Sequence, residues 1–342
     1  MIVRVGLIGC GYWGPNLLRN FAKTEGCQVS AIADLDTQKL GAMQQLFPLA
    51  QVFHDGEELL AKKDVDAVAI ATPTSSHYRL GKAALLSGKH VFVEKPMTAS
   101  MKEAEELIHI AEREHRVLMV DHTFVYTGAV QKIRELLSSG EVGEVCYYDA
   151  VRVNLGMFRH DENVLWDLGP HDLSILAHLV GKRPVAVSAV GAGLVGLQDW
   201  KQESIAYVNV WFSGGVLAHI HLNWLSPVKI RRTLIGCTRK MIIYDHLDPD
   251  YQVKVFDKGV NIETAEQRYQ LQVQYRSGDM VSPKVDQSEA LAVATKHFVS
   301  CIGQGRRPIT DGYAGLEVVR LLEAAQQSMK SQGELVSIRA EN

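Results

Sequence analysis

The sequence has few of the features that mark secreted, membrane or metal-binding proteins. Its five cysteines are scattered, and none forms a Cys-x-x-Cys pair. This odd, scattered set predicts reduced thiols in a cytoplasmic protein and argues against a disulfide framework or a zinc site. No apolar run approaches the length of a membrane span. The first residues lead directly into a strand pattern, without the basic and apolar regions of a secretion signal.

An excess of charge of either sign is also lacking. The chain has 36 Lys and Arg against 39 Asp and Glu, a net charge of −3. Because the basic residues are dispersed, we expect no nucleic-acid partner and no membrane partner. The close histidine pair His219 and His221 has no carboxylate at ligand spacing, so we expect no metal site. The 342 residues are enough for two domains.

What the sequence does contain is a glycine-rich turn close to its beginning. Residues 5–8 form an apolar run that predicts a buried strand, and Gly9-x-Gly11-x-x-Gly14 and a helical pattern follow. Strand, glycine turn and helix are the context of a dinucleotide fingerprint. Gly9 permits the turn, Gly11 leaves room for a pyrophosphate, and Gly14 lets the helix approach the strand. We therefore expect the amides at this helix N-terminus to bind phosphate.

An acidic residue follows the second predicted strand. Residues 29–33, apolar except for Ser30, predict this strand, and Asp34 follows it directly. A carboxylate there accepts hydrogen bonds from both ribose hydroxyls of NAD and repels the 2′-phosphate of NADP. Asp34 could instead cap the helix predicted over residues 37–47, but Asp36 can supply that cap. The sequence therefore favours NAD over NADP.

The order of predicted elements changes near residue 123. Before it, apolar strands alternate with helical patterns, which predicts a doubly wound parallel sheet with both faces covered. After it, strands follow one another without intervening helices, and two helical patterns, over residues 287–302 and 313–329, end the chain. This predicts an α+β domain with an open, mostly antiparallel sheet. We therefore assign residues 1–122 to an α/β Rossmann domain and residues 123–342 to a second domain.

Two stretches carry polar groups suited to alcohol oxidation. Glu94-Lys95-Pro96 follows a predicted strand, and Asp167 precedes His171 by four positions. If this second stretch is helical, Asp167 and His171 share a face. Histidine would then take the hydroxyl proton, aspartate would orient it, and lysine would stabilise the alkoxide. On spacing alone, a helix cap at Asp167 or Asp172 explains the second stretch more simply, and Pro170 suits the first turn of a helix over residues 171–180.

Taken together, these segments resemble the Gfo/Idh/MocA family of sugar and cyclitol oxidoreductases. The resemblance extends over nearly the whole chain in the right order. It rests on residues 9–14, Ala71-Thr72-Pro73, Glu94-Lys95-Pro96, Gly140-Glu141-Val142-Gly143 and Asp167-x-x-x-His171-Asp172. It implies an NAD-binding Rossmann domain and a substrate domain whose open sheet makes the contacts of a homodimer or homotetramer.

The resemblance also implies roles for individual residues. The catalytic residues would be Lys95, Asp167 and His171, with Glu94 on the nicotinamide ribose and Pro96 after a cis peptide. The cofactor-binding set would be Gly9, Gly11, Tyr12, Trp13, Gly14, Asp34, Thr72, Pro73, His77, Glu94 and Lys95.

Three segments are most similar to the branch of the family that acts on nucleotide sugars, such as UDP-N-acetylglucosamine and its uronate. They are residues 164–174, 221–231 and 308–312; residues 122–128 depart from the family because they lack its usual arginine and proline. A diphosphate or a uronate carboxylate requires cations. The candidates for substrate binding are Arg152, Asn154, Arg159, His171, Lys229 and Arg231. The alternative for the basic residues is ordinary surface charge.

The sequence therefore predicts an NAD-dependent dehydrogenase that moves a hydride between nicotinamide and a ring carbon, C3, of a nucleotide sugar. Two alternatives stay open. One is a dehydrogenase of free cyclitols or monosaccharides of the inositol type. The other is an NAD-binding sensor without turnover.

Replacement of Asp34 tests the cofactor assignment. A hydrogen bond to a charged group contributes about 1.5–3 kcal/mol, so Asp34→Ala should weaken NAD binding about tenfold or more. It should also reduce the preference over NADP, because the repulsion of the 2′-phosphate is lost. Titration of both cofactors into wild type and variant measures this. An unchanged ratio of the two dissociation constants would contradict the role given to Asp34.

Overall fold

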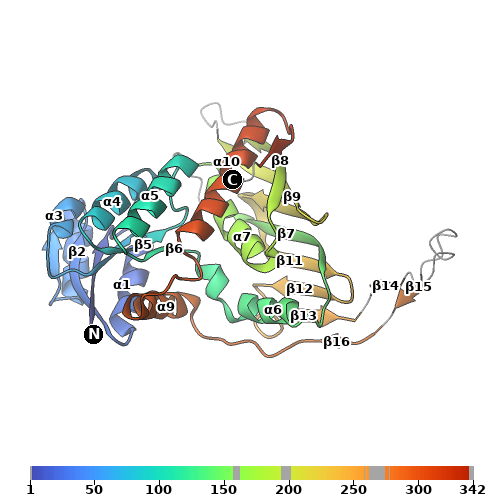
Figure 1. Cartoon of the computed structure of the whole chain (residues 1–342), viewed down its shortest axis with the longest axis horizontal. Helices are drawn as coiled ribbons and strands as arrows, with labels where there is room; N and C mark the ends of the chain where they lie inside the picture. Colours follow the sequence, from blue (N-terminus) through green and yellow to red (C-terminus); the bar gives the residue numbers. More distant parts are fainter. Residues whose placement is uncertain are drawn as a thin grey trace. The chain divides into compact units, whose positions relative to one another are not determined.

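The computed structural model describes residues 2–156, 162–193, 202–257, 259–261, 274–276 and 278–338 (Figure 1). Contacts within the chain divide it into two units. Unit 1 comprises Met1–Tyr126 and Ser288–Glu323, and unit 2 comprises Thr127–Gln287 and Ala324–Asn342. Residues 288–323 therefore belong with the N-terminal unit, whereas the sequence-based boundary at residue 123 placed them in the second domain.

Unit 1 is built on a six-stranded parallel sheet in the order β3-β2-β1-β4-β5-β6. The strands are β1 (Val3–Ile8), β2 (Cys27–Ala33), β3 (Gln51–Phe53), β4 (Ala67–Ile70), β5 (His90–Glu94) and β6 (Leu118–Asp121). Every residue of β4 is buried, which explains why the central strands are continuous apolar runs.

Helices cover both faces of this sheet. They are α1 (Gly14–Lys23), α2 (Thr37–Leu46), α3 (Gly56–Leu60), α4 (Thr74–Leu86), α5 (Met101–Arg113), the 3-10 helix η1 (Thr123–Tyr126), α9 (Ala290–Gln304) and the first part of α10 (Gly312–Lys330). Alternate residues of β5 enter two separate cores, Phe92 on one side and Val91 and Val93 on the other. Figure 1 shows α4 and α5 side by side on one face. The predicted doubly wound sheet is confirmed.

Aromatic packing explains why α9 returns to unit 1. The ring of Phe298 lies 5.4 Å from that of Phe92 and 6.2 Å from that of Phe21. Just before α9, Glu289 forms a salt bridge with Arg19 of α1. These contacts join segments that are far apart in the sequence. The local pattern therefore predicts the helix α9 but does not indicate which sheet it covers.

Unit 2 contains a nine-stranded sheet in the order β16-β13-β12-β11-β7-β10-β9-β8-β17. Only the pairing of β7 with β10 is parallel among these described strands. The strands are β7 (Val145–Leu155), β8 (Pro184–Gly193), β9 (Glu203–Phe212), β10 (Leu217–Asn223), β11 (Leu225–Cys237), β12 (Met241–Asp245), β13 (Val253–Phe256), β16 (Met280–Val281) and β17 (Val336–Ser337). A separate pair is formed by β14 (Gly259–Asn261) and β15 (Gln274–Arg276).

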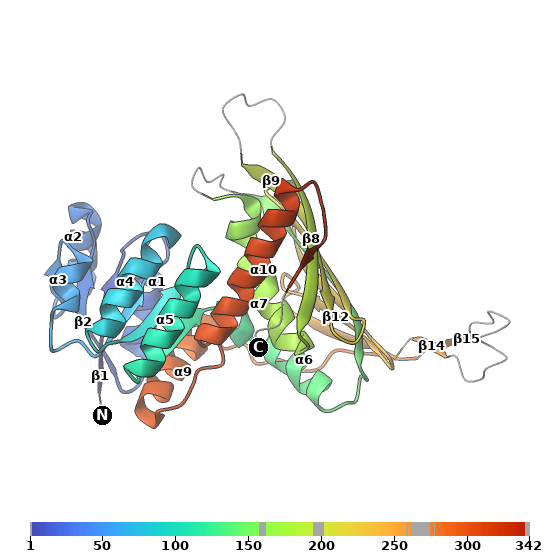
Figure 2. The same ribbon diagram turned by 45° about the horizontal axis from the view of Figure 1, so that its top comes forward.

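Among the residues that the structure describes, helices cover one face of the large sheet and leave the other face open. Helix α7 (Val164–Val180) packs on β7, β9 and β10, and α6 (Gly128–Ser138) packs on α7. Figure 2 shows both helices on the same side of the sheet. In β9 and β10 every second residue is buried, whereas Tyr207 and Leu217 on the other face are 37% and 41% exposed. The predicted open, mostly antiparallel sheet is therefore confirmed.

Three further features concern the residues that the model describes. None of their helices is long and apolar enough to cross a membrane. The five cysteines are all free thiols. No group of three or more His, Cys, Asp or Glu within the described ranges is arranged to hold a metal ion.

Candidate active site

The glycine turn after β1 has the shape that a dinucleotide requires. Gly9 has a φ of +103°, and a Cβ on Gly14 would lie 2.2 Å from the Gly9 carbonyl oxygen. A Cβ on Gly11 would meet nothing within 4 Å, so there is open space beside the turn. Helix α1 has no side-chain cap and no acidic residue in its first turn. Because the amides of an uncapped helix N-terminus attract anions, the turn fits the pyrophosphate of NAD.

Asp34 lies just beyond the carboxyl end of β2 and is held in place by backbone amides. Its Oδ2 accepts a hydrogen bond of 2.5 Å from the Cys10 N–H, and its Oδ1 accepts one of 2.7 Å from the Asp36 N–H. Asp36 itself caps α2 by accepting from Gln38 and Lys39. The cap is thus supplied by Asp36, and the fixed, partly exposed carboxylate of Asp34 fits a ribose diol.

His77 joins the loops that follow β4 and β5. Its side chain is 1% exposed; Nδ1 lies 2.9 Å from the Pro96 oxygen and Nε2 2.7 Å from the Thr72 oxygen. Burial lowers the pKa of His77, and the two carbonyl contacts oppose this shift. The residue thus fixes the Thr72-Pro73 loop against the Lys95–Pro96 peptide, which is cis, as the family resemblance implied. A direct contact of His77 with the cofactor stays a prediction.

The glycine turn also contacts the end of β6 through Trp13. The indole Nε1 of Trp13 donates a 3.1 Å hydrogen bond to Asp121 Oδ2, and its ring stacks on Tyr12 with centroids 6.4 Å apart. Tyr12 is 86% exposed. The tryptophan is therefore oriented by unit 1 itself, while the tyrosine is accessible to a ligand.

Asp121 is a site residue that the motifs did not reveal. It ends β6, and the register of the parallel pair sets it beside Glu94 at the end of β5. Burial raises the pKa of both carboxyls, and the charge of Lys95 opposes the shift in each case. The available signal was its position, because it is a charged residue directly after the apolar run of β6.

Asp167 and His171 lie on α7, which begins earlier than predicted. Asn163 caps the helix by accepting a 3.1 Å hydrogen bond from the Trp166 N–H, so Pro170 lies inside the helix and not in its first turn. Asp167 and His171 are partly exposed and share one helical face. The Trp224 indole donates a 3.1 Å hydrogen bond to Asp167 Oδ2. Asp167 is thus held by a tryptophan and does not cap the helix.

The predicted substrate-binding cations gather around the middle of the sheet in unit 2. Arg152 on β7 is 3% exposed and forms a bidentate ion pair with Asp172 of α7, with Nη2 3.2 Å from Oδ1. Arg231 on β11 lies opposite Arg152 in the strand register. Burial and the charge of Arg152 lower the pKa of Arg231.

Two further residues, Lys229 and His246, are electrostatically coupled to Arg152 and Arg231. Burial, together with Arg231, Arg152 and Lys229, lowers the pKa of His246 to about 4. Lys229 itself is exposed. We call Arg152, Lys229 and Arg231 the cationic cluster; His246, beside them, is neutral at neutral pH. Asp172 pairs with Arg152, and its charge also acts on Arg231.

The remaining predicted substrate residues are less informative. Asn154 lies on β7 two positions after Arg152 and is partly exposed. Arg159 lies outside the described residues. Their roles stay predictions.

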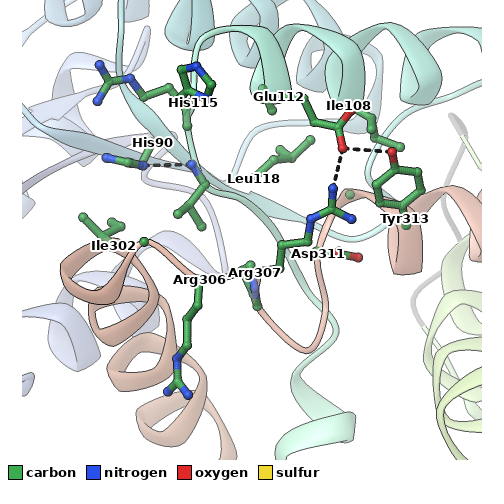
Figure 3. A pocket seen from close by; sticks show the side chains of 16 residues that line it. His90, Ile108, Glu112, His115, Leu118, Ile302, Arg306, Arg307, Asp311 and Tyr313 are labelled. Carbon is green, nitrogen blue, oxygen red and sulfur yellow. Dashed lines mark hydrogen bonds and ion pairs between the residues drawn. The ribbon is translucent and has the colours of Figure 1, made fainter.

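Unit 1 also contains a cavity of about 480 Å³, away from its candidate cofactor residues (Figure 3). It is lined by His90 and Leu118, which begin β5 and β6, so it is at the amino ends of the strands. There Glu112 Oε1 accepts from Arg307 at 2.6 Å and from the Tyr313 hydroxyl at 2.9 Å. The candidate cofactor residues of unit 1 lie at the opposite, carboxyl ends.

Comparisons with known proteins agree with this architecture. The model "Oxidoreductase family, NAD-binding Rossmann fold" (GFO_IDH_MocA) matches residues 3–122, and the "GFO/IDH/MocA C-terminal domain" matches residues 130–243. These matches confirm the predicted fold class and the NAD-binding Rossmann domain.

Individual relatives cover almost the full length of the chain. UDP-N-acetylglucosamine 3-dehydrogenase of Acidithiobacillus ferrooxidans is 28% identical over 95% of this chain and 96% of its own. D-apiose dehydrogenase of Paraburkholderia graminis is 25% identical over 98% and 89%. A crystal structure of the Acidithiobacillus enzyme superposes with a TM-score of 0.79 at 26% identity, covering 97% of this chain and 98% of the other.

The buried ion pair of unit 2 is open to a direct test. Asp172→Asn removes the charge that Arg152 faces, and an uncompensated buried charge costs about 3–5 kcal/mol. Urea unfolding followed by tryptophan fluorescence measures the loss, since Trp166, Trp211 and Trp224 all lie in unit 2. The control is Glu135→Gln, which removes an exposed ion pair with Lys132 and should cost less than about 1 kcal/mol. Equal, small effects of both substitutions would show that the pair is not buried as described.

Proposed function

Because the chain belongs to the Gfo/Idh/MocA family of NAD-binding oxidoreductases, we propose that it is an NAD-dependent dehydrogenase of a nucleotide sugar. The hydride would move between nicotinamide and a ring carbon, C3, of a UDP-N-acetylhexosamine or its uronate. The full-length similarity to UDP-N-acetylglucosamine 3-dehydrogenase supports this substrate class. The similarity to D-apiose dehydrogenase supports only the broader class of sugar substrates.

The observation that carries the proposal is the pairing of two arginines in the cationic cluster. Arg152 is buried and Arg231 is half-buried, and they lie opposite each other in the strand register. Partly desolvated guanidinium groups are stabilised by an anionic partner, and arginine binds phosphates and carboxylates with two parallel hydrogen bonds. A nucleotide sugar brings a diphosphate, and a uronate adds a carboxylate. A free inositol brings neither, so the cluster favours the charged substrate.

The catalytic roles follow from the chemistry of the side chains. NAD, when bound, accepts or returns the hydride at C4 of its nicotinamide. We assign His171 as the base that takes the hydroxyl proton, Asp167 as the carboxylate that orients it, and Lys95 as the ammonium that stabilises the alkoxide. Trp224 would fix Asp167 through the indole hydrogen bond. In the reverse reaction, the same groups return the proton to the reduced sugar.

Two other features of the protein belong to the same proposal. The uncovered face of the nine-stranded sheet, which includes the partly exposed Tyr207 and Leu217, would form the contact of a homodimer or homotetramer. The five free thiols suit a reducing compartment such as the cytoplasm. A sensor without turnover is disfavoured, because Lys95, Asp167 and His171 are all present.

A substrate panel tests the proposal. The purified chain is incubated with NAD and, separately, with UDP-, dTDP- and GDP-sugars, free monosaccharides and inositols, and NADH absorbance and thermal shifts are recorded. We expect reduction of NAD and a stabilising shift with UDP-N-acetylhexosamines or their uronates. Turnover of free inositols or monosaccharides without any response to nucleotide sugars would establish the second alternative. NAD binding with no turnover of any sugar would establish the sensor.

Two adjacent arginines provide a matched test of the cationic cluster. Arg231 lies opposite Arg152, whereas Arg232 pairs with Asp245 at 2.7 Å on the other face of β11. Loss of a charge-assisted hydrogen bond costs about 1.5–3 kcal/mol, so Arg231→Ala should raise KM for the nucleotide sugar about tenfold to a hundredfold. Arg232→Ala should change KM less than about threefold, since an exposed ion pair contributes little. Equal effects of both variants would remove the cluster from the substrate site.

A further inference from the structure

Two carboxyl groups lie side by side at the carboxyl edge of the parallel sheet. Glu94 ends β5, Asp121 ends β6, and the two residues are direct partners in the register. Neighbouring strands are about 4.8 Å apart, so carboxyls in this position are within reach of each other. Asp121 is 1% exposed, and Glu94 Oε1 is buried. The family resemblance gives Glu94 a role in binding the nicotinamide ribose. It gives no role to Asp121, the buried acid beside Glu94.

The hydrogen bonds of Asp121 favour it as the ionised member of the pair. Its Oδ2 accepts from the Trp13 indole at 3.1 Å, and its Oδ1 accepts from the Thr123 hydroxyl at 2.6 Å. Both donors point at Asp121, and a carboxylate has only acceptor sites to offer them. A proton on Asp121 would compete with these two hydrogen bonds.

The surroundings of Glu94 favour its protonated form. Its Oε2 accepts from the Lys95 N–H at 3.2 Å, whereas Oε1 has no donor among the described residues. The Glu94 side chain is placed beside Asp121 by the strand register. Two adjacent carboxylates withdrawn from water repel each other, so a single proton between them is favourable. Because Glu94 has the fewer donors, we expect it to carry this proton.

The surrounding charges agree with one proton in the pair. The positive charge of Lys95 acts on both carboxyls and opposes the rise of their pKa values. His122, directly after Asp121, is 2% exposed, and burial lowers its pKa to about 3, so it is neutral. His77 is buried between two carbonyl oxygens and also lies near Lys95. One protonated acid, one carboxylate and one ammonium leave this buried group close to neutral.

We propose that Glu94 and Asp121 share a single proton, carried by Glu94, and that Asp121 is thereby a positioning residue for Lys95 and for the Trp13 turn. The part that concerns Lys95 as a catalytic group rests on the proposed function; the shared proton does not. A pair with one negative charge leaves the Lys95 ammonium able to stabilise an alkoxide. A pair with two negative charges would oppose the same alkoxide.

The proposal has a consequence for the pH dependence of stability. Burial and the neighbouring Asp121 raise the pKa of Glu94 well above its ordinary value. The folded chain therefore keeps a proton that the unfolded chain has released. This contribution to stability is complete below the ordinary carboxyl pKa and is lost as the pH rises through the raised pKa of Glu94. Glu94→Gln has no such proton, so its stability should not show this loss.

Infrared spectroscopy of the full chain without NAD and without sugar tests the proposal directly. A buried protonated carboxyl gives a C=O stretching band separate from the carboxylate bands, and its intensity against pH gives a titration midpoint. We expect the band at neutral pH in wild type and its loss in Glu94→Gln. Absence of the band in wild type, or its survival in Glu94→Gln, would overturn the assignment of the proton to Glu94.

Two further variants test the sharing, and they should act in opposite directions. Asp121→Asn removes the neighbouring negative charge and should lower the midpoint by at least about one pH unit, which is tenfold in the proton-binding constant. Thr123→Val removes a donor that stabilises the Asp121 carboxylate, so the pair should hold its proton more tightly and the midpoint should rise. If neither variant moves the midpoint, Glu94 is an isolated buried acid and the sharing is refuted. Thr123→Val keeps the test available if Asp121→Asn fails to fold.

A matched control and a functional measurement complete the design. Glu317→Gln removes another carboxyl whose pKa is raised by burial, and it should leave the band and its midpoint unchanged. In the enzyme with NAD and its substrate, Asp121→Asn should shift the basic limb of the kcat profile to lower pH by the same amount as the infrared midpoint. If the kcat profile stays fixed while the infrared midpoint moves, the shared proton does not influence the catalytic role of Lys95. Because the infrared measurement needs no substrate, failure of the sugar assignment leaves it interpretable.

Discussion

The parallel register of unit 1 is the constraint on which the candidate site depends. Parallel strands bring all their carboxyl ends to one edge, and four of those ends carry the groups discussed above. Gly9 follows β1, Asp34 follows β2, Glu94 ends β5 and Asp121 ends β6. A shift of one residue between β5 and β6 would turn one of the two carboxyls to the other face. The register thus fixes both the geometry and the charge at this edge.

Hydrogen bonds to backbone atoms are prominent among the described contacts that hold this edge together. The Cys10 amide binds Asp34, and the Thr72 and Pro96 carbonyls bind His77. Trp13 reaches Asp121 across the sheet. Loops fixed in this way keep their shape without a ligand, so less conformational entropy is lost when a cofactor binds. In unit 2, Trp224 and Arg152 hold Asp167 and Asp172 of α7 in a comparable way.

The sequence was sufficient where the signal is local. The glycine turn, Asp34 with the Asp36 cap, the apolar strands and the open sheet all follow from spacing and periodicity within short windows. It was insufficient where distant segments meet. The return of α9 depends on Phe298 packing against Phe21 and Phe92, and the start of α7 depends on the cap at Asn163 rather than on Pro170. The sequence did not indicate a role for Asp121; its position beside Glu94 follows from the pairing of β5 with β6.

The central claim is that this chain moves a hydride between a sugar ring carbon and nicotinamide with the help of Lys95. The most direct measurement uses UDP-N-acetylglucosamine carrying deuterium at C3, with NAD, and detects the label in the reduced cofactor by mass spectrometry. The account predicts deuterium in the reduced cofactor formed by wild type, and at least a hundredfold less of it with Lys95→Ala, although that variant still binds NAD. Reduced cofactor without deuterium, or equal labelling by Lys95→Ala, would contradict it.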